Sequence, residues 1–104
     1  MKEEQSKNQL NIELSDEMAE GIYANLSIIA HSSSEFVLDF VRIMPNTPKA
    51  KVKARIILTA EHAKRLLYAL KENVDKYESQ YGKIDLPEQK IQIPMNFGGF
   101  KGEA

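Results

Sequence analysis

The sequence has no cysteine and no tryptophan among its 104 residues. Without cysteine, a disulfide-bonded scaffold, a thiolate metal site and a cysteine nucleophile are all excluded. No apolar run approaches the roughly 20 residues that a membrane-spanning helix needs. Residues 1–8 are polar and lack the apolar core of a signal peptide, so we expect a cytoplasmic protein that begins with a disordered polar tail.

The remaining composition is that of an ordinary globular protein, with 42% hydrophobic and 28% charged residues. A chain of this length has room for one domain, which we place over residues 9–82. Proline and glycine argue against a helix in residues 83–104, which we expect to form an extended tail. Within it, the alternation of Ile91 and Ile93 predicts that residues 89–93 lie against a sheet edge or a neighbouring subunit.

Alternating apolar residues predict a series of strands before the middle of the chain. The clearest alternation places Leu10, Ile12 and Leu14 on one side of an extended segment. A connector after it fits one short helical turn, and two prolines mark a later loop because proline cannot sit inside a sheet ladder. The predicted strands cover residues 9–15, 22–31, 35–43 and 50–58.

A helix of about six turns is predicted to follow the last strand. Thr59 is a good N-cap, Glu61 lies in the first turn where the helix dipole favours an acid, and Gly82 suits the C-terminal end. Its apolar stripe consists of Ala63, Leu66, Leu67, Leu70, Val74, Tyr77 and Tyr81. The predicted fold is therefore α+β, an antiparallel β-meander of three to four strands with one long C-terminal helix packed on one face.

The loop lengths predict how the strands pair. A three-residue loop at Ser32–Ser34 would place Leu38 opposite Ile28, and the proline-containing loop would place Leu38 opposite Ile56. The even-numbered apolar residues would then share one face, which the helix is expected to cover. Asp39 would lie opposite Arg55 on the other face and form a cross-strand ion pair.

This other face would also carry β-branched residues, more than a monomer needs on a solvated surface. Strand propensity alone is one explanation, and a second protein surface packing there is the other. We favour the second and expect a homodimer or a larger assembly. The expected interface residues are Ile29, Val37, Val41 and Ile57.

Charge is distributed unevenly, although the net charge is only −1. Residues 1–41 contain eight acids and two lysines, whereas residues 42–65 contain seven bases and one acid. Lys51, Lys53 and Arg55 are therefore candidates for contact with a polyanion. Because Asp39 partly neutralises them and few aromatic residues accompany them, nucleic-acid binding is expected to be unlikely.

No pattern in the sequence indicates catalysis. His31 and His62 are its two histidines, and their spacing brings no further metal ligands together with them. A serine triplet follows His31, but a hairpin tip offers no cleft for a nucleophile, its base and oxyanion donors. We therefore expect no enzymatic activity and no cofactor.

The residues that carry a family resemblance lie between about residues 21 and 82. They include Tyr23-Ala24-Asn25-Leu26, His31-Ser32, the run from Glu35 to Phe40, Ala54 to Thr59, and the run from His62 to Gly82. In these segments the chain resembles a small prokaryotic domain family of unknown function, which implies no activity, cofactor or site residue. Its element order is also loosely similar to that of SecB-type export chaperone subunits.

The function that these features favour is that of a non-catalytic oligomeric interaction or assembly module. A chaperone-like, peptide-binding oligomer is the first alternative. A polyanion binder is the second.

Overall fold

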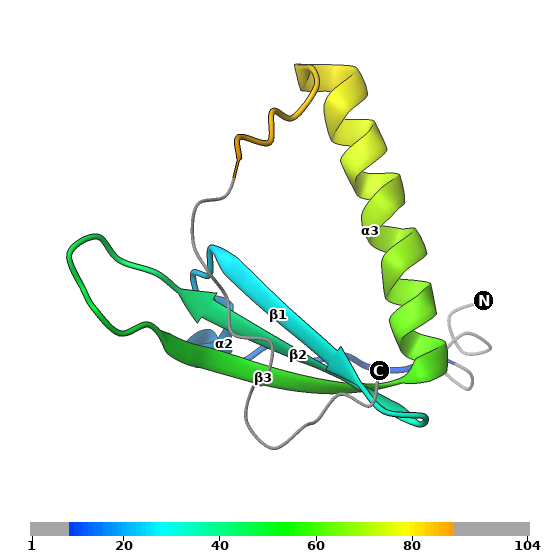
Figure 1. Ribbon diagram of the computed structural model, residues 1–104. Helices are drawn as coiled ribbons and strands as arrows, with labels where there is room; N and C mark the ends of the chain where they lie inside the picture. The colour runs from blue at the N-terminus through cyan, green and yellow to red at the C-terminus, as the bar shows by residue number, and fades with distance from the viewer. Residues whose placement is uncertain (1–8, 89–104) are drawn as a thin grey trace.

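The computed structural model describes residues 9–88, which form a three-stranded antiparallel sheet and a long helix (Figure 1). The strands follow one another in the sheet in the order β1-β2-β3. The α+β class and the meander are confirmed. In chain order the elements are α2 (Asp16–Ala19), β1 (Leu26–His31), β2 (Glu35–Arg42), β3 (Lys51–Thr59) and α3 (Ala60–Tyr81).

The turn between β1 and β2 is one residue shorter than the sequence predicts. The Ser32 hydroxyl accepts hydrogen bonds from the backbone N–H groups of Ser34 and Glu35, both at 3.3 Å. The Ser32 N–H donates to the Glu35 carbonyl at 2.9 Å, which leaves a loop of two residues. The predicted pairing of Ile28 with Leu38 is therefore wrong by one residue, because Ile28 lies opposite Asp39.

The predicted pairing of β2 with β3 is confirmed over most of its length. Leu38 lies opposite Ile56 and Asp39 lies opposite Arg55, with an irregularity after Phe40. In the connecting loop, Thr47 donates its backbone N–H to the Met44 carbonyl, and Asn46 has a φ of 61°. A proline before a residue with positive φ is typical of a type II turn, so local sequence accounts for this connection.

Because antiparallel partners point to the same side, the register defines two faces of the sheet. The face that we call the Asp39 face carries Leu26, Ile28, Ala30, Val37, Asp39, Val41, Val52, Arg55 and Ile57. The other, which we call the Phe40 face, carries Ser27, Ile29, His31, Phe36, Leu38, Phe40, Ala54, Ile56 and Leu58.

The predicted apolar row across the three strands does not form. The shifted β1 register places Ile29 on the Phe40 face, while Val37, Val41 and Ile57 lie on the Asp39 face. Val37 and Val41 are also buried, at 5% and 3% exposure, so they belong to the core of the protomer. Ile29 and Ile57 are exposed, but on opposite sides of the sheet.

Helix α3 begins and ends where the sequence predicts. The Thr59 hydroxyl accepts a hydrogen bond from the His62 N–H at 3.1 Å and caps the N-terminus. Gly82 has a φ of 103° and donates its N–H to the Glu78 carbonyl at 2.9 Å. Both caps satisfy backbone groups that a helix end otherwise leaves without partners.

The direction of α3 differs from the expected packing on one face. Thr59 is both the last residue of β3 and the cap of the helix, so no loop separates the two elements. The helix consequently leaves the end of the sheet at a steep angle (Figure 1). It contacts β3 and β2, as expected, but none of its residues is buried.

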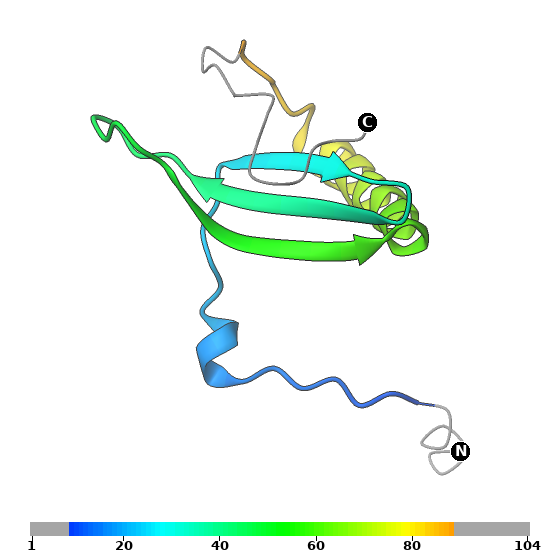
Figure 2. The ribbon, with the colours of Figure 1, turned by 60° about the horizontal axis from the view of Figure 1, so that its bottom comes forward.

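The predicted strand over residues 9–15 is absent from the described structure. The segment is extended, and Figure 2 shows it running beyond the β3 side of the sheet without joining it. The expected helical turn does form as α2, whose N-cap Ser15 accepts a hydrogen bond from the Met18 N–H. The expectations for residues 1–8 and 89–93 lie outside the described residues.

Candidate interaction surface

The described residues expose many large apolar side chains and bury few. Val37 and Val41 are the two buried hydrophobic residues among them, whereas nineteen large hydrophobic side chains are at least 37% exposed. Scattered exposed apolar residues are normal in monomers, whereas a surplus of this kind is typical of proteins that present an interaction surface. The exposed side chains gather on α3 and on the N-terminal segment, and the sheet exposes two on each face, Ile29 and Ile56 on the Phe40 face and Val52 and Ile57 on the Asp39 face.

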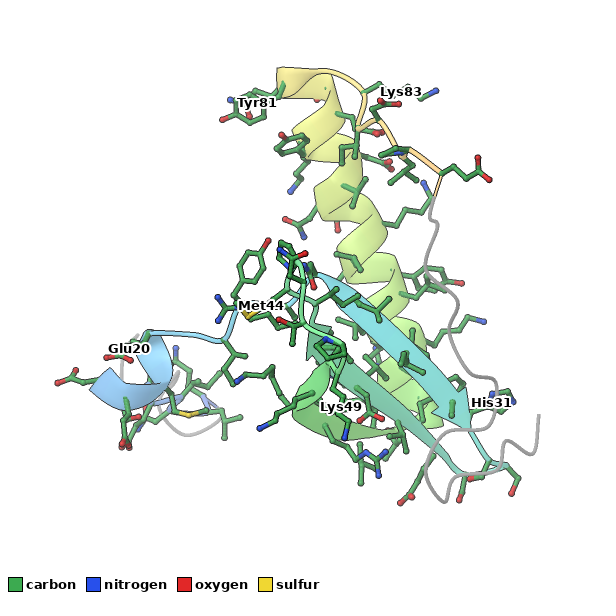
Figure 3. The ribbon with its side chains drawn as sticks, turned by 60° about the vertical axis from the view of Figure 1, so that its left-hand side comes forward. Glu20, His31, Met44, Lys49, Tyr81 and Lys83 are labelled. Atoms are coloured by element: carbon green, nitrogen blue, oxygen red, sulfur yellow. The ribbon has the colours of Figure 1, made fainter. Side chains whose placement is uncertain are left out.

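The apolar stripe of α3 is the longest of these surfaces. Leu67, Leu70 and Tyr81 are 58%, 59% and 68% exposed, and the rings of Tyr77 and Tyr81 lie 4.9 Å apart. Figure 3 shows Tyr81 at the end of the helix farthest from the strands, so the sheet of the same chain cannot cover it. The stripe therefore lies open along most of the helix.

The opposite face of α3 is charged. Arg65 pairs with Glu61 at 2.7 Å, and Lys71 pairs with Asp75 at 3.0 Å. Such exposed pairs at i,i+4 add a few tenths of a kcal/mol each to helix stability. The charged pairs and the apolar stripe therefore lie on opposite sides of α3.

The Asp39–Arg55 ion pair predicted from the sequence is confirmed. Arg55 donates from Nε to Asp39 Oδ1 at 2.7 Å and from Nη2 to Asp39 Oδ2 at 2.8 Å, a bidentate geometry. The Asp39 side chain is 2% exposed, whereas that of Arg55 is 45% exposed. The hydrogen bond to Asp39 and the charge of its carboxylate raise the pKa of the Arg55 guanidinium.

Replacing Arg55 by Val is expected to lower the Tm by roughly 10 °C or more, because it leaves a buried carboxylate without its donors. The double variant Asp39→Val, Arg55→Val should recover most of this loss, since it removes both charges from the sheet. Thermal unfolding at one fixed chain concentration measures the effect. If the double variant is as unstable as Arg55→Val, the pair has a role beyond mutual neutralisation.

The candidate polyanion residues do not form one cluster. Arg55 is held by Asp39, while Lys51 lies opposite Arg42 on the Phe40 face and Lys53 falls in the irregular step of the register. Contact of these three residues with a polyanion stays a prediction.

The two histidines lie on different elements at the same end of the sheet. His31 ends β1 and its ring stacks on Phe36 with a centroid distance of 5.3 Å, whereas His62 lies in the first turn of α3. Within residues 9–88, no group of three or more histidine, aspartate or glutamate residues is placed to hold a metal ion.

Asn25 is a structural residue that the sequence analysis missed. Its side chain bridges to the backbone of Ile43, accepting from the N–H at 2.8 Å and donating to the carbonyl at 3.1 Å. The Asn25 N–H also donates to the Val41 carbonyl at 3.0 Å. The side chain thus continues the β1–β2 ladder beyond Leu26, and no signal in the sequence indicated this role because Asn25 lies inside the strand predicted over residues 22–31.

The comparisons with known proteins concern the family of the chain. A family model described as "Protein of unknown function (DUF3467)" matches residues 1–86. The chain belongs to this family. No curated protein and no solved structure matches it, and the loose similarity to SecB-type subunits receives no support. No helix in the described part of this DUF3467 chain is long and apolar enough to cross a membrane.

Proposed function

We propose that this DUF3467 protein is a non-catalytic assembly module whose working form contains at least two copies of the chain. The observation that carries the proposal is the state of α3, a 22-residue helix with no buried residue. Most helical stability in proteins comes from packing of an apolar face, and the sheet of the same chain leaves this face open.

The missing packing also argues for a second copy as the partner. Within residues 9–88 the protomer buries two apolar side chains, which do little to offset the conformational entropy lost on folding. The partner must therefore be present whenever the chain folds, and a second copy meets this condition. A dimer interface of standard size takes about 20–30 residues from each side, which the nineteen exposed apolar side chains and their neighbours can supply.

The polar groups support a binding role rather than catalysis. The contacting charges on α3 form exposed i,i+4 pairs, and the buried Asp39 has both its oxygens bonded to Arg55. A general acid or nucleophile needs neighbouring groups that prepare it for reaction, and these arrangements supply none.

Sedimentation at micromolar concentration is expected to give a mass of at least twice 11.8 kDa. The physical reason is the apolar surface that a lone protomer leaves in water. Folded, strictly monomeric protein under these conditions contradicts the proposal.

A further inference from the structure

Residues 9–15, which we call the arm, lie extended but unpaired. Leu10, Ile12 and Leu14 are 80%, 85% and 71% exposed. Residues 9–14 form no hydrogen bond with the other described residues. An extended segment with alternating apolar residues and unused backbone groups has the properties of a strand that lacks its sheet.

We propose that the arm of one copy adds as a fourth strand to the β3 edge of a second copy. This inference rests on the proposed homo-oligomer and specifies how its subunits join. Addition of an extended segment to a sheet edge satisfies backbone groups on both sides. Exchange of an identical element between copies is a common route to dimers.

The geometry within one chain argues against pairing of the arm with its own sheet. Helix α2 and the residues up to Gly21, whose φ is 78°, carry the arm away from β1. Figure 2 shows the arm beyond the β3 side with a clear separation from the strand. Figure 3 likewise shows Glu20, the C-cap of α2, well apart from the strands. A second copy can bring its own β3 edge to the arm without any change in this arrangement.

Charge complementarity selects β3 as the edge that receives the arm. Residues 9–20 contain four acids and no base, whereas residues 49–60 contain four bases and no acid. Two β3 edges cannot pair with each other without bringing these bases together, which is unfavourable. The β1 strand, Leu26–His31, contains no acidic residue, lysine or arginine and offers no such attraction.

The side chains of the arm fit the two faces next to β3. Its apolar side matches the Phe40 face, where β3 presents Ala54 and the 45% exposed Ile56. Glu13 then points to the Asp39 face beside Arg55. That guanidinium uses Nε and Nη2 for Asp39, and its Nη1 makes no hydrogen bond with the described residues. Glu13 can therefore accept a hydrogen bond from Arg55 Nη1.

Cross-linking tests the exchange directly, because the natural chain has no cysteine. One chain carries Asn11→Cys in the arm and another carries Lys53→Cys at the β3 edge. The two are refolded together and treated with a short bifunctional maleimide. We expect a covalent pair that contains one chain of each kind. Ser27→Cys on β1 replaces Lys53→Cys in the matched control, which should give little of this product.

A charge exchange gives a second measurement. Glu13→Lys should raise the dissociation constant of the assembly about three- to tenfold, and adding Lys53→Glu should restore it within about twofold. Asp85→Lys makes the same change of charge outside the arm and should have little effect on the dissociation constant.

The possible results separate this inference from the proposed function. An assembly that forms but gives no mixed covalent pair overturns the arm exchange and leaves the homo-oligomer intact. A single chain that carries both Asn11→Cys and Lys53→Cys gives a further check, because a cross-link that forms only within such chains also overturns the exchange. A monomeric protein overturns both.

Discussion

Diluting the protein about a hundredfold is expected to lower its Tm by about 10 °C. Unfolding of a dimer releases two chains, so dilution favours the unfolded state. The size of this fall in Tm follows from an unfolding enthalpy of about 0.7 kcal/mol per residue, applied to a dimer with about 150 ordered residues. Thermal melts followed by far-ultraviolet circular dichroism measure the shift, and α3 supplies most of the signal.

The control for this experiment is the unfolding of a small monomeric domain over the same concentrations. Its Tm does not depend on concentration, because one folded chain gives one unfolded chain. A constant Tm for the DUF3467 protein would therefore mean that each chain folds alone. It would contradict the view that a second copy completes the core around α3.

The parts of the fold that the sequence predicts well are those determined by local chemistry. Thr59 and Gly82 mark the ends of α3 because each provides what a helix terminus lacks, a side-chain acceptor in one case and a positive φ in the other. Asp39 and Arg55 meet because their alternation and the adjoining loop place them in register. Each of these predictions depends only on residues that are close in the sequence or directly opposite each other on neighbouring strands.

The predicted β1–β2 register was wrong because it depends on which serine hydroxyl bonds to the backbone of the turn. The Ser32 side chain closes the turn over two residues, and the three consecutive serines do not reveal which of them will do so. A shift of one residue moves every side chain of a strand to the other face. The expected interface row failed for this reason, with Ile29 separated from Val37 and Ile57.

The exposure of α3 and of the arm could not be predicted from one chain's pattern. An apolar stripe or an alternating strand shows that a partner surface is needed, but not whether it lies in the same chain. The missing loop at Thr59 directs α3 away from the sheet, and α2 directs residues 9–15 away from β3. The apolar stripe of α3 and the alternation of residues 9–15 were therefore recognised in the sequence, but their exposure in the protomer was not.

Replacing Leu70 by Lys is expected to raise the dissociation constant of the assembly roughly tenfold or more, because it places a charge in the middle of the exposed stripe. Leu70 is 59% exposed in the protomer, so the substitution removes little packing within one chain. Lysine is also a good helix former, and α3 itself should persist in whatever assembly remains. Sedimentation over a range of concentrations measures the change.

The matched control is Ser79→Lys. Ser79 lies nine residues after Leu70, half a turn away after two full turns, and is therefore on the charged side of α3. The new charge there should leave the dissociation constant within about twofold of the natural value, because surface substitutions outside an interface have small effects. If both variants raise the dissociation constant equally, the effect comes from the added positive charge and not from its position on α3. Weakening by Leu70→Lys alone assigns it to the stripe, whose association then supplies the packing that α3 lacks in a single chain.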